Sequence, residues 1–168
     1  MCATNSAACT RRTVLHTNAS VYDPLGWLIP LTIQNKVSFQ SLWKQNYDWE
    51  PLPEQLQQEW IRLCSQSTGF QKEIPRRVAD KTKQHKLVLF SDASSIAMAA
   101  CAYLCNEEDH HLLIAKSKLP KINEKHTIPM LEPNAFTLAA RLARSVIEEL
   151  ADAVAVKEVA SCVTPKSL

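Results

Sequence analysis

Hydrophobic positions in the first half of the chain recur at helical spacing. The pattern covers residues 32–47 and resumes after Pro53, a residue that helices accept in their first turn. The apolar stripe of the second segment consists of Leu52, Leu56, Trp60 and Leu63. Polar residues fill the other faces of this segment, so we predict two helices, the second of them amphipathic.

In the second half the pattern becomes that of short strands. Apolar or small residues occupy 87–90, 96–105 and 111–116, with short polar turns between them. Strands joined in this way form an antiparallel meander. An apolar stripe from Leu131 to Val146 then predicts a long helix that covers the sheet, with Pro133 in its first turn. This order of elements predicts an α+β fold.

These patterns divide the chain into three parts. We interpret residues 1–20 as a loose polar tail, residues 21–80 as a mostly helical connection segment, and residues 86–168 as a second unit. The polar run before the second unit carries four basic residues: Arg76, Arg77, Lys81 and Lys83. Such a run either contacts a phosphate backbone weakly or forms a solvated linker, and the linker is the more common outcome.

Composition excludes several classes of protein. The chain has only two glycines, too few for a glycine-rich phosphate loop. Its formal net charge is +2, which indicates no particular partner. We find neither an export signal nor an apolar run long enough to span a membrane. The six cysteines include no Cys-x-x-Cys pair, so we expect reduced thiols and a cytoplasmic or nuclear protein that is not secreted.

The four tryptophans all lie in the first half of the chain. They are Trp27, Trp43, Trp49 and Trp60. Tryptophans can stack on nucleic-acid bases, but between predicted helices they more often form the packed core. We therefore interpret them as core residues.

Two carboxylates are the candidates for chemistry. Asp92 follows the first predicted strand, where an acid is held rigidly and still reaches solvent. Glu132 lies at the start of the long helix. Each has an ordinary explanation, since Asp forms turns and acids favour helix N-termini. Together they are the kind of ligands that Mg²⁺ prefers.

A series of short motifs resembles the BEL/Pao retrotransposon polyprotein, in the region after its reverse transcriptase. The motifs are Val21-Tyr-Asp-Pro-Leu-Gly-Trp-Leu-Ile-Pro, Leu42-Trp43, Asp48-Trp49, Leu52-Pro53, Glu59-Trp60, Ile74-Pro75-Arg76, Phe90-Ser91-Asp92-Ala93-Ser94, Ala115-Lys116-Ser117-Lys118, Ile128-Pro129-Met130-Leu131-Glu132 and Ala139-Ala140-Arg141-Leu142-Ala143. Their order matches the family over about residues 11–160.

The resemblance implies a connection segment followed by an RNase H-like domain. It implies that Asp92 is the catalytic acid of the first strand and Glu132 the acid of the first helix. Enzymes of this type hydrolyse the RNA strand of an RNA–DNA hybrid with two Mg²⁺ ions, which roughly four carboxylates hold. The implied partners are the hybrid or a reverse transcriptase module.

The sequence departs from the family at the site. Pro165 stands where the family has a third acid, and no fourth acid follows before Leu168. Met130 replaces an arginine, and Pro133 replaces a leucine. We therefore expect an incomplete RNase H-like unit, a three-strand antiparallel meander plus a covering helix, with one unpaired edge on its first strand. We expect vestigial metal ligands, weak or absent Mg²⁺ binding and no robust activity.

Five other interpretations compete with this one. A retropeptidase is disfavoured because its Asp-Ser/Thr-Gly turn is missing at Asp92-Ala93-Ser94. A zinc site or a Cys–His nucleophile would use residues among Cys101, Cys105, His110 and His111, whose spacing fits neither well. A non-catalytic module that binds nucleic acid or a polymerase is the main alternative. The last is a genomic relic without function.

Overall fold

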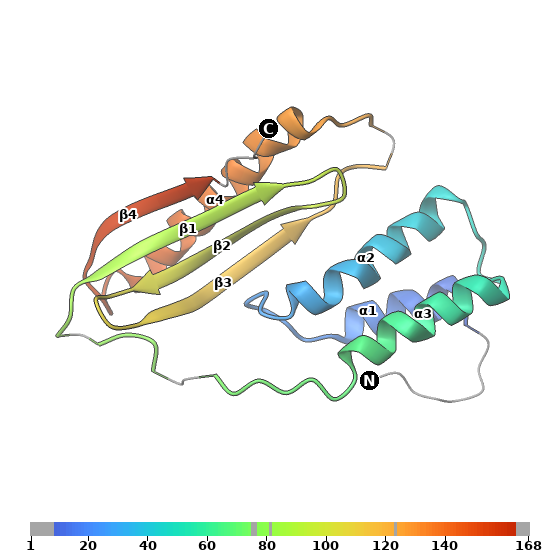
Figure 1. Ribbon diagram of the computed structural model, residues 1–168, viewed down its shortest axis with the longest axis horizontal. Coiled ribbons are helices and arrows are strands. Elements are labelled where there is room, and N and C mark those ends of the chain that lie inside the picture. Colours follow the sequence, from blue (N-terminus) through green and yellow to red (C-terminus); the bar gives the residue numbers. More distant parts are fainter. Residues whose placement is uncertain (1–8, 75–76, 81, 123, 164–168) are drawn as a thin grey trace. The chain divides into compact units, whose positions relative to one another are not determined.

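The computed structural model describes residues 9–74, 77–80, 82–122 and 124–163 and shows two compact units (Figure 1). The helical unit extends to Pro24 and continues over Leu28–Glu73. The sheet unit contains the rest of the chain from Ile74 together with Leu25–Trp27. A short segment from the first half of the chain therefore belongs to the second unit.

The helical unit contains three helices. They are α1 (Arg11–Ser20), α2 (Ile29–Lys44) and α3 (Glu54–Ser67). Both helices predicted from the apolar spacing are confirmed. The prediction of a loose tail over residues 1–20 is wrong for Arg11–Ser20, which form α1. Thr10 and Thr13 form a reciprocal capping box at the start of this helix. Val14 is only 1% exposed, so this helix also contributes to the core.

The core of the helical unit joins all three helices. Val14, Leu42, Leu52, Trp60 and Leu63 are buried together. The backbone reinforces this packing, since the Leu52 N–H donates to the Cys9 carbonyl at 2.9 Å. The loop before α3 is thereby fastened to the segment that leads into α1.

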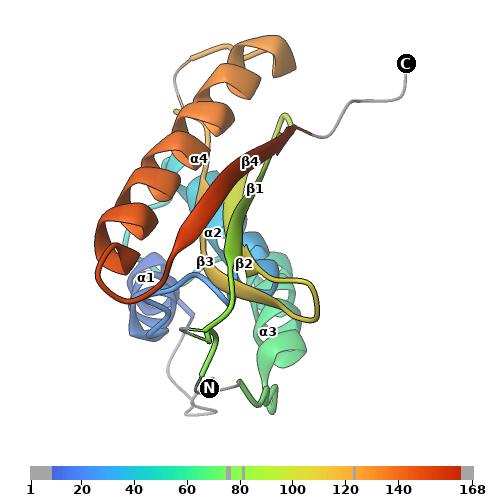
Figure 2. The same cartoon turned by 90° about the vertical axis from the view of Figure 1, so that its left-hand side faces the viewer.

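The sheet unit has four strands and one long helix. They are β1 (His85–Ala93), β2 (Met98–Cys105), β3 (His110–Lys118), α4 (Ile128–Leu150) and β4 (Val156–Val163). The predicted antiparallel meander is confirmed. The predicted unpaired edge on the first strand is wrong: the sheet order is β3-β2-β1-β4, and β4 pairs with β1 in parallel. Figure 2 shows α4 lying along one face of this sheet.

Alternating burial defines the two faces of the sheet. In β1, Leu87, Leu89, Ser91 and Ala93 are buried, whereas Asp92 is exposed. The buried set lies on the face that α4 covers, because Leu87 and Leu89 share a core cluster with Ala143 and Val146 of α4. Side chains of a strand alternate between faces, so Asp92 projects from the opposite, open face.

The long helix begins earlier than its apolar stripe indicated. It starts at Ile128 with Pro129 in its first turn, which leaves Pro133 inside the helix. A proline there cannot donate to the carbonyl four residues earlier. Packing compensates, because Leu131 and Ala135 are each 1% exposed. Among the described residues, no helix combines the length and apolar character that a membrane span requires.

Leu25–Trp27 forms a strap along β3. The Ala115 N–H donates to the Leu25 carbonyl at 2.7 Å, and the Trp27 indole N–H donates to the Leu113 carbonyl at 3.1 Å. Between these contacts Gly26 has φ 73°, a conformation that favours glycine. The strap thus pairs one backbone N–H and one backbone carbonyl on the outer edge of β3. An unpaired strand edge could otherwise associate with a strand of another chain.

Candidate functional site

Asp92 lies at the carboxyl end of β1, opposite Ala99 of β2. It is exposed on the open face of the sheet. The rigid position expected from the sequence is therefore present, with the carboxylate accessible to solvent.

Glu132 lies in the N-terminal part of α4 and is also exposed. Its neighbour Leu131 packs in one buried cluster with Ala93 and Met98, the residues that join β1 to β2. This cluster anchors the start of α4 at the end of β1 where Asp92 lies. The structure thus brings the backbones of the two predicted acids to the same end of the sheet unit.

The carboxylate of Asp92 nevertheless leaves the sheet on the face away from α4. Its two neighbours Ser91 and Ala93 are buried on the α4 side, at 3% and 1% exposure. Within the described ranges, no group of three or more histidine, cysteine, aspartate or glutamate side chains is placed to hold a metal ion. Among the residues that the structure describes, Asp92 and Glu132 are therefore not joined by the further ligands that a two-metal centre uses.

The resemblance implies a third acid shortly after β4. Parallel strands end at the same edge of a sheet, and the last described pair joins Ser91 to Val163, one residue before Asp92. The end of β4 therefore lies beside the end of β1, and the implied third position stays a prediction. Pro165 itself lies outside the described residues.

The basic residues predicted to contact nucleic acid are paired with acids where the structure describes them. A guanidinium nitrogen of Arg77 lies 3.3 Å from a carboxylate oxygen of Asp80, and Lys83 forms an ion pair with Glu108. Hydrogen bonds from Thr82 hold the pKa of Asp80 below its usual value, and the hydrogen bond to Glu108 raises the pKa of Lys83. These pairs reduce the charge available to a phosphate.

The other two basic residues of that run, Arg76 and Lys81, lie outside the described residues. The predicted contact of this run with nucleic acid therefore stays a prediction.

The four proposed zinc ligands do not converge. Cys101 and Cys105 lie on one face of β2, as predicted, but four residues apart along an extended strand. His110 pairs with Cys105, and His111 projects to the other face of β3. Burial raises the pKa of both thiols, which favours the unreactive thiol form over the thiolate that a nucleophile or metal ligand needs.

The tryptophans separate into different environments. Trp60 is 7% exposed and belongs to the helical core, so the core interpretation is confirmed there. It is wrong for Trp43 and Trp49, which are 45% and 48% exposed. The guanidinium carbon of Arg11 lies 4.2 Å from the ring centre of Trp43 and 4.3 Å from that of Trp49. We call these three residues the aromatic–cation cluster.

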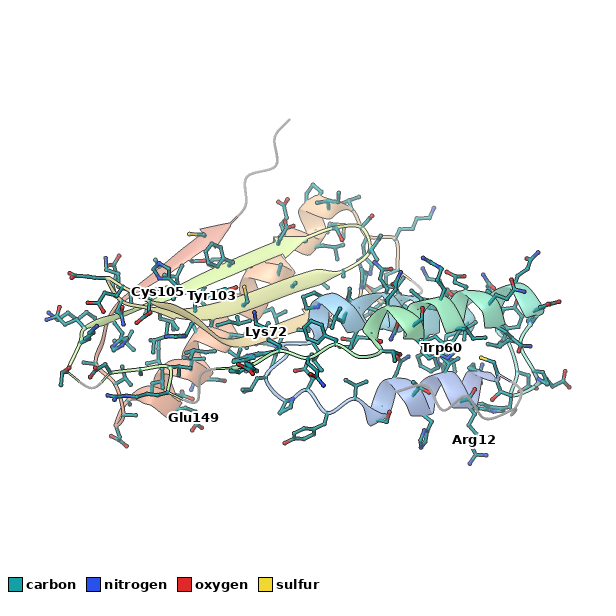
Figure 3. The ribbon with its side chains drawn as sticks, turned by 60° about the horizontal axis from the view of Figure 1, so that its bottom comes forward. Arg12, Trp60, Lys72, Tyr103, Cys105 and Glu149 are labelled. Atoms are coloured by element: carbon teal, nitrogen blue, oxygen red, sulfur yellow. The ribbon has the colours of Figure 1, made fainter. Side chains whose placement is uncertain are left out.

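The sequence carries no signal for this cluster, because Arg11 is far from both tryptophans along the chain. The adjacent Arg12 shows the difference, since it points away from the helices into solvent (Figure 3). Hydrogen bonds from Leu52 to the Cys9 carbonyl and from Arg11 to the Tyr47 carbonyl hold the start of α1 against the segment between α2 and α3.

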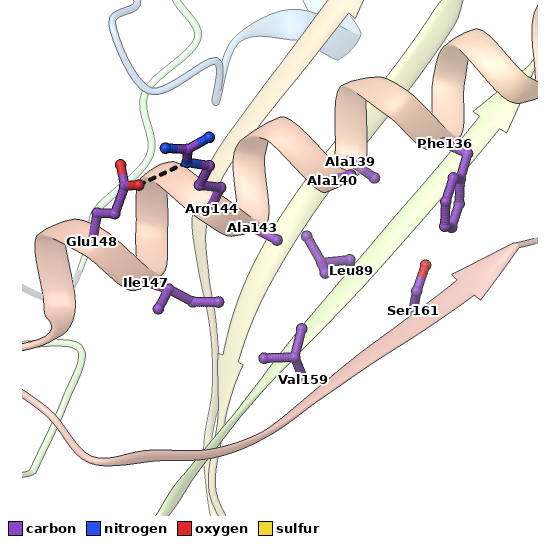
Figure 4. A pocket seen from close by; sticks show the side chains of 10 residues that line it. All are labelled: Leu89, Phe136, Ala139, Ala140, Ala143, Arg144, Ile147, Glu148, Val159 and Ser161. Carbon is purple, nitrogen blue, oxygen red and sulfur yellow. Dashed lines mark hydrogen bonds and ion pairs between the residues drawn. The ribbon is translucent and has the colours of Figure 1, made fainter.

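An apolar groove of about 490 Å³ runs between α4 and β4 (Figure 4). Leu89 and Ala139 are buried in it, while Phe136 and Val159 are about half exposed. An ion pair from Arg144 to Glu148, 2.7 Å long, lies along its helical wall. This groove was not predicted, because it depends on β4 pairing with β1.

Comparison with known proteins gave one family. The model of the Pao retrotransposon-like RNaseH-like domain matches residues 10–162. A search of curated proteins found no match to this chain.

Proposed function

This chain belongs to the Pao retrotransposon-like RNaseH-like domain family, and on that basis we propose that it derives from a nuclease acting on RNA–DNA hybrids within a retrotransposon polyprotein. We further propose that the chain on its own does not cleave the hybrid. Asp92 and Glu132 are then the vestigial metal ligands of the ancestral site.

The observation that carries this proposal is the pair of acids at one end of the sheet unit. Asp92 belongs to β1 and Glu132 to α4, and the packing of Leu131 against Ala93 brings these two elements together. A site for a hard cation takes carboxylates from separate elements in this way. Bound Mg²⁺ would supply Lewis-acid activation of water and phosphate in such a nuclease. The sequence supports the loss of activity, because Pro165 stands where the resemblance implies a third acid.

The test is cleavage of a labelled RNA–DNA hybrid by the purified chain, first with Mg²⁺ and then with Mn²⁺. An Asp92→Asn variant serves as the matched control, since it removes one charge and almost no volume. We expect no cleavage by either protein, with far-UV circular dichroism showing both to be folded. Cleavage by the original chain that disappears in the variant would refute the loss of activity.

A non-catalytic module is the second candidate. The observation in its favour is the aromatic–cation cluster, which exposes two tryptophan rings on the helical unit, away from either acid in the sequence. The partner would be nucleic acid or a reverse transcriptase module. Binding of the hybrid that persists in Asp92→Asn, without cleavage, would favour this candidate over an enzyme.

A further inference from the structure

Two large aromatic rings are held half exposed on the helical unit. Trp43 lies at the end of α2 and Trp49 in the loop that follows, and each leaves almost half of its surface to solvent. Rings of this size normally bury most of their surface. Trp43 also contacts Phe39 edge-on, with ring centres 6.1 Å apart, so its orientation is restrained from a second side.

The group that positions both rings is a buried cation. Arg11 is 7% exposed, and its guanidinium donates a hydrogen bond to the Tyr47 carbonyl. Its Nε is buried without a hydrogen-bond partner, and no acid forms an ion pair with it in the described ranges. The positive charge is therefore balanced mainly by the two ring faces and one carbonyl.

This combination suits a planar ligand that carries negative charge. Each tryptophan leaves almost half of its surface exposed for stacking, whereas the guanidinium is buried against the two rings and acts on a ligand only through its charge. Nucleotides combine both properties, since every base has a π-face and every linkage a phosphate. Proteins that bind single strands use this pairing of aromatic side chains with positive charge.

The charges around the cluster determine whether stacking or attraction of phosphates contributes more to binding. Arg12 and Lys44 are exposed next to the cluster in sequence, but so are Asp48 and Glu50. Because these charges balance, attraction of phosphates is weak and stacking has to supply most of the binding. Stacking needs base faces that are free, and in a duplex they are occupied by neighbouring bases.

We propose that the aromatic–cation cluster is a stacking site for the bases of single-stranded nucleic acid. The site is separate from Asp92 and Glu132 and does not depend on metal. It rests on the non-catalytic module proposed above, for which it names the ligand, and its failure would leave the proposed nuclease ancestry untouched.

The experiment is fluorescence anisotropy with a labelled single-stranded oligouridylate, using the full chain. We expect Trp49→Ala and Trp43→Ala each to weaken binding by about tenfold, the loss typical of one stacking contact. Trp49→Phe keeps a stacking surface and should retain most of the affinity. This variant separates loss of stacking from loss of folding.

Tyr22→Ala is the matched control, because Tyr22 is an aromatic residue of the same unit that is 88% exposed. It should bind like the original chain. Inorganic polyphosphate, which offers charge without bases, should compete poorly. Undetectable binding, equal affinity of all variants, or competition by polyphosphate as strong as that by the oligonucleotide would each overturn the proposal.

Discussion

Replacing Arg11 with methionine should destabilise the helical unit. Methionine preserves an unbranched apolar stem of similar length, so the change removes mainly the charged group. Two contacts with aromatic rings are lost, at 4.2 and 4.3 Å, each contributing about 0.5–2 kcal/mol. The hydrogen bond to the Tyr47 carbonyl is lost as well, and a charged donor contributes about 1.5–3 kcal/mol there.

Relief of the buried charge offsets part of this loss, because a guanidinium that is 7% exposed is poorly solvated. We therefore expect the free energy of unfolding to fall by about 2–4 kcal/mol. Urea denaturation followed by tryptophan fluorescence measures it, since Trp43, Trp49 and Trp60 all lie in this unit.

Arg12→Met is the matched control, because Arg12 is the exposed neighbour and should change stability by less than about 0.5 kcal/mol. Equal urea midpoints for the two variants would refute the role assigned to the Arg11 guanidinium. They would mean that the rings are held by Phe39 and the loop alone.

Two other predictions concern the sheet unit. Leu131→Ala should lower the free energy of unfolding by about 2–5 kcal/mol, because the side chain is 1% exposed, whereas Phe136→Ala on the same helix, 51% exposed, should cost clearly less. Urea denaturation followed by circular dichroism compares them, and equal losses would contradict the anchoring of α4 at β1. Burial raises the pKa of Cys101 and of Cys105, so at about pH 8 fewer of these thiols are ionised. Iodoacetamide should therefore label the exposed Cys162 faster than Cys101 and Cys105, and the difference in labelling rate should narrow as the pH rises. Equal labelling rates for these three cysteines, measured by mass spectrometry, would contradict this.

Local patterns predicted most of the secondary structure. The apolar stripe through Leu56, Trp60 and Leu63 correctly predicted α3. The short apolar runs correctly predicted the meander of β1, β2 and β3. The capping box at Thr10 was missed because its first turn is polar, and α1 depends on burying Val14 against distant residues. Contacts of that kind are not visible in a local window.

The candidate site was predicted only in part for a related reason. Residue type and position along the elements identified Asp92 and Glu132 as acids at one end of the sheet unit. Which face each carboxylate occupies depends on register, since a shift by one residue reverses every side chain. The register is set by the packing of Leu87 and Leu89 against α4, which the local sequence does not show.

The position of Asp92 limits what the shared fold can imply about activity. Its carboxylate leaves the open face of the sheet, whereas Glu132 belongs to the helix on the covered face. On our proposal Asp92 and Glu132 are the residues that would hold a metal ion, one from the strand and one from the helix. β4 runs parallel to β1 and ends beside it, with Val163 paired to Ser91. Our proposal takes the third acid of such a site from the segment after this strand, as the resemblance implies, and the sequence has Pro165 there instead of an acid.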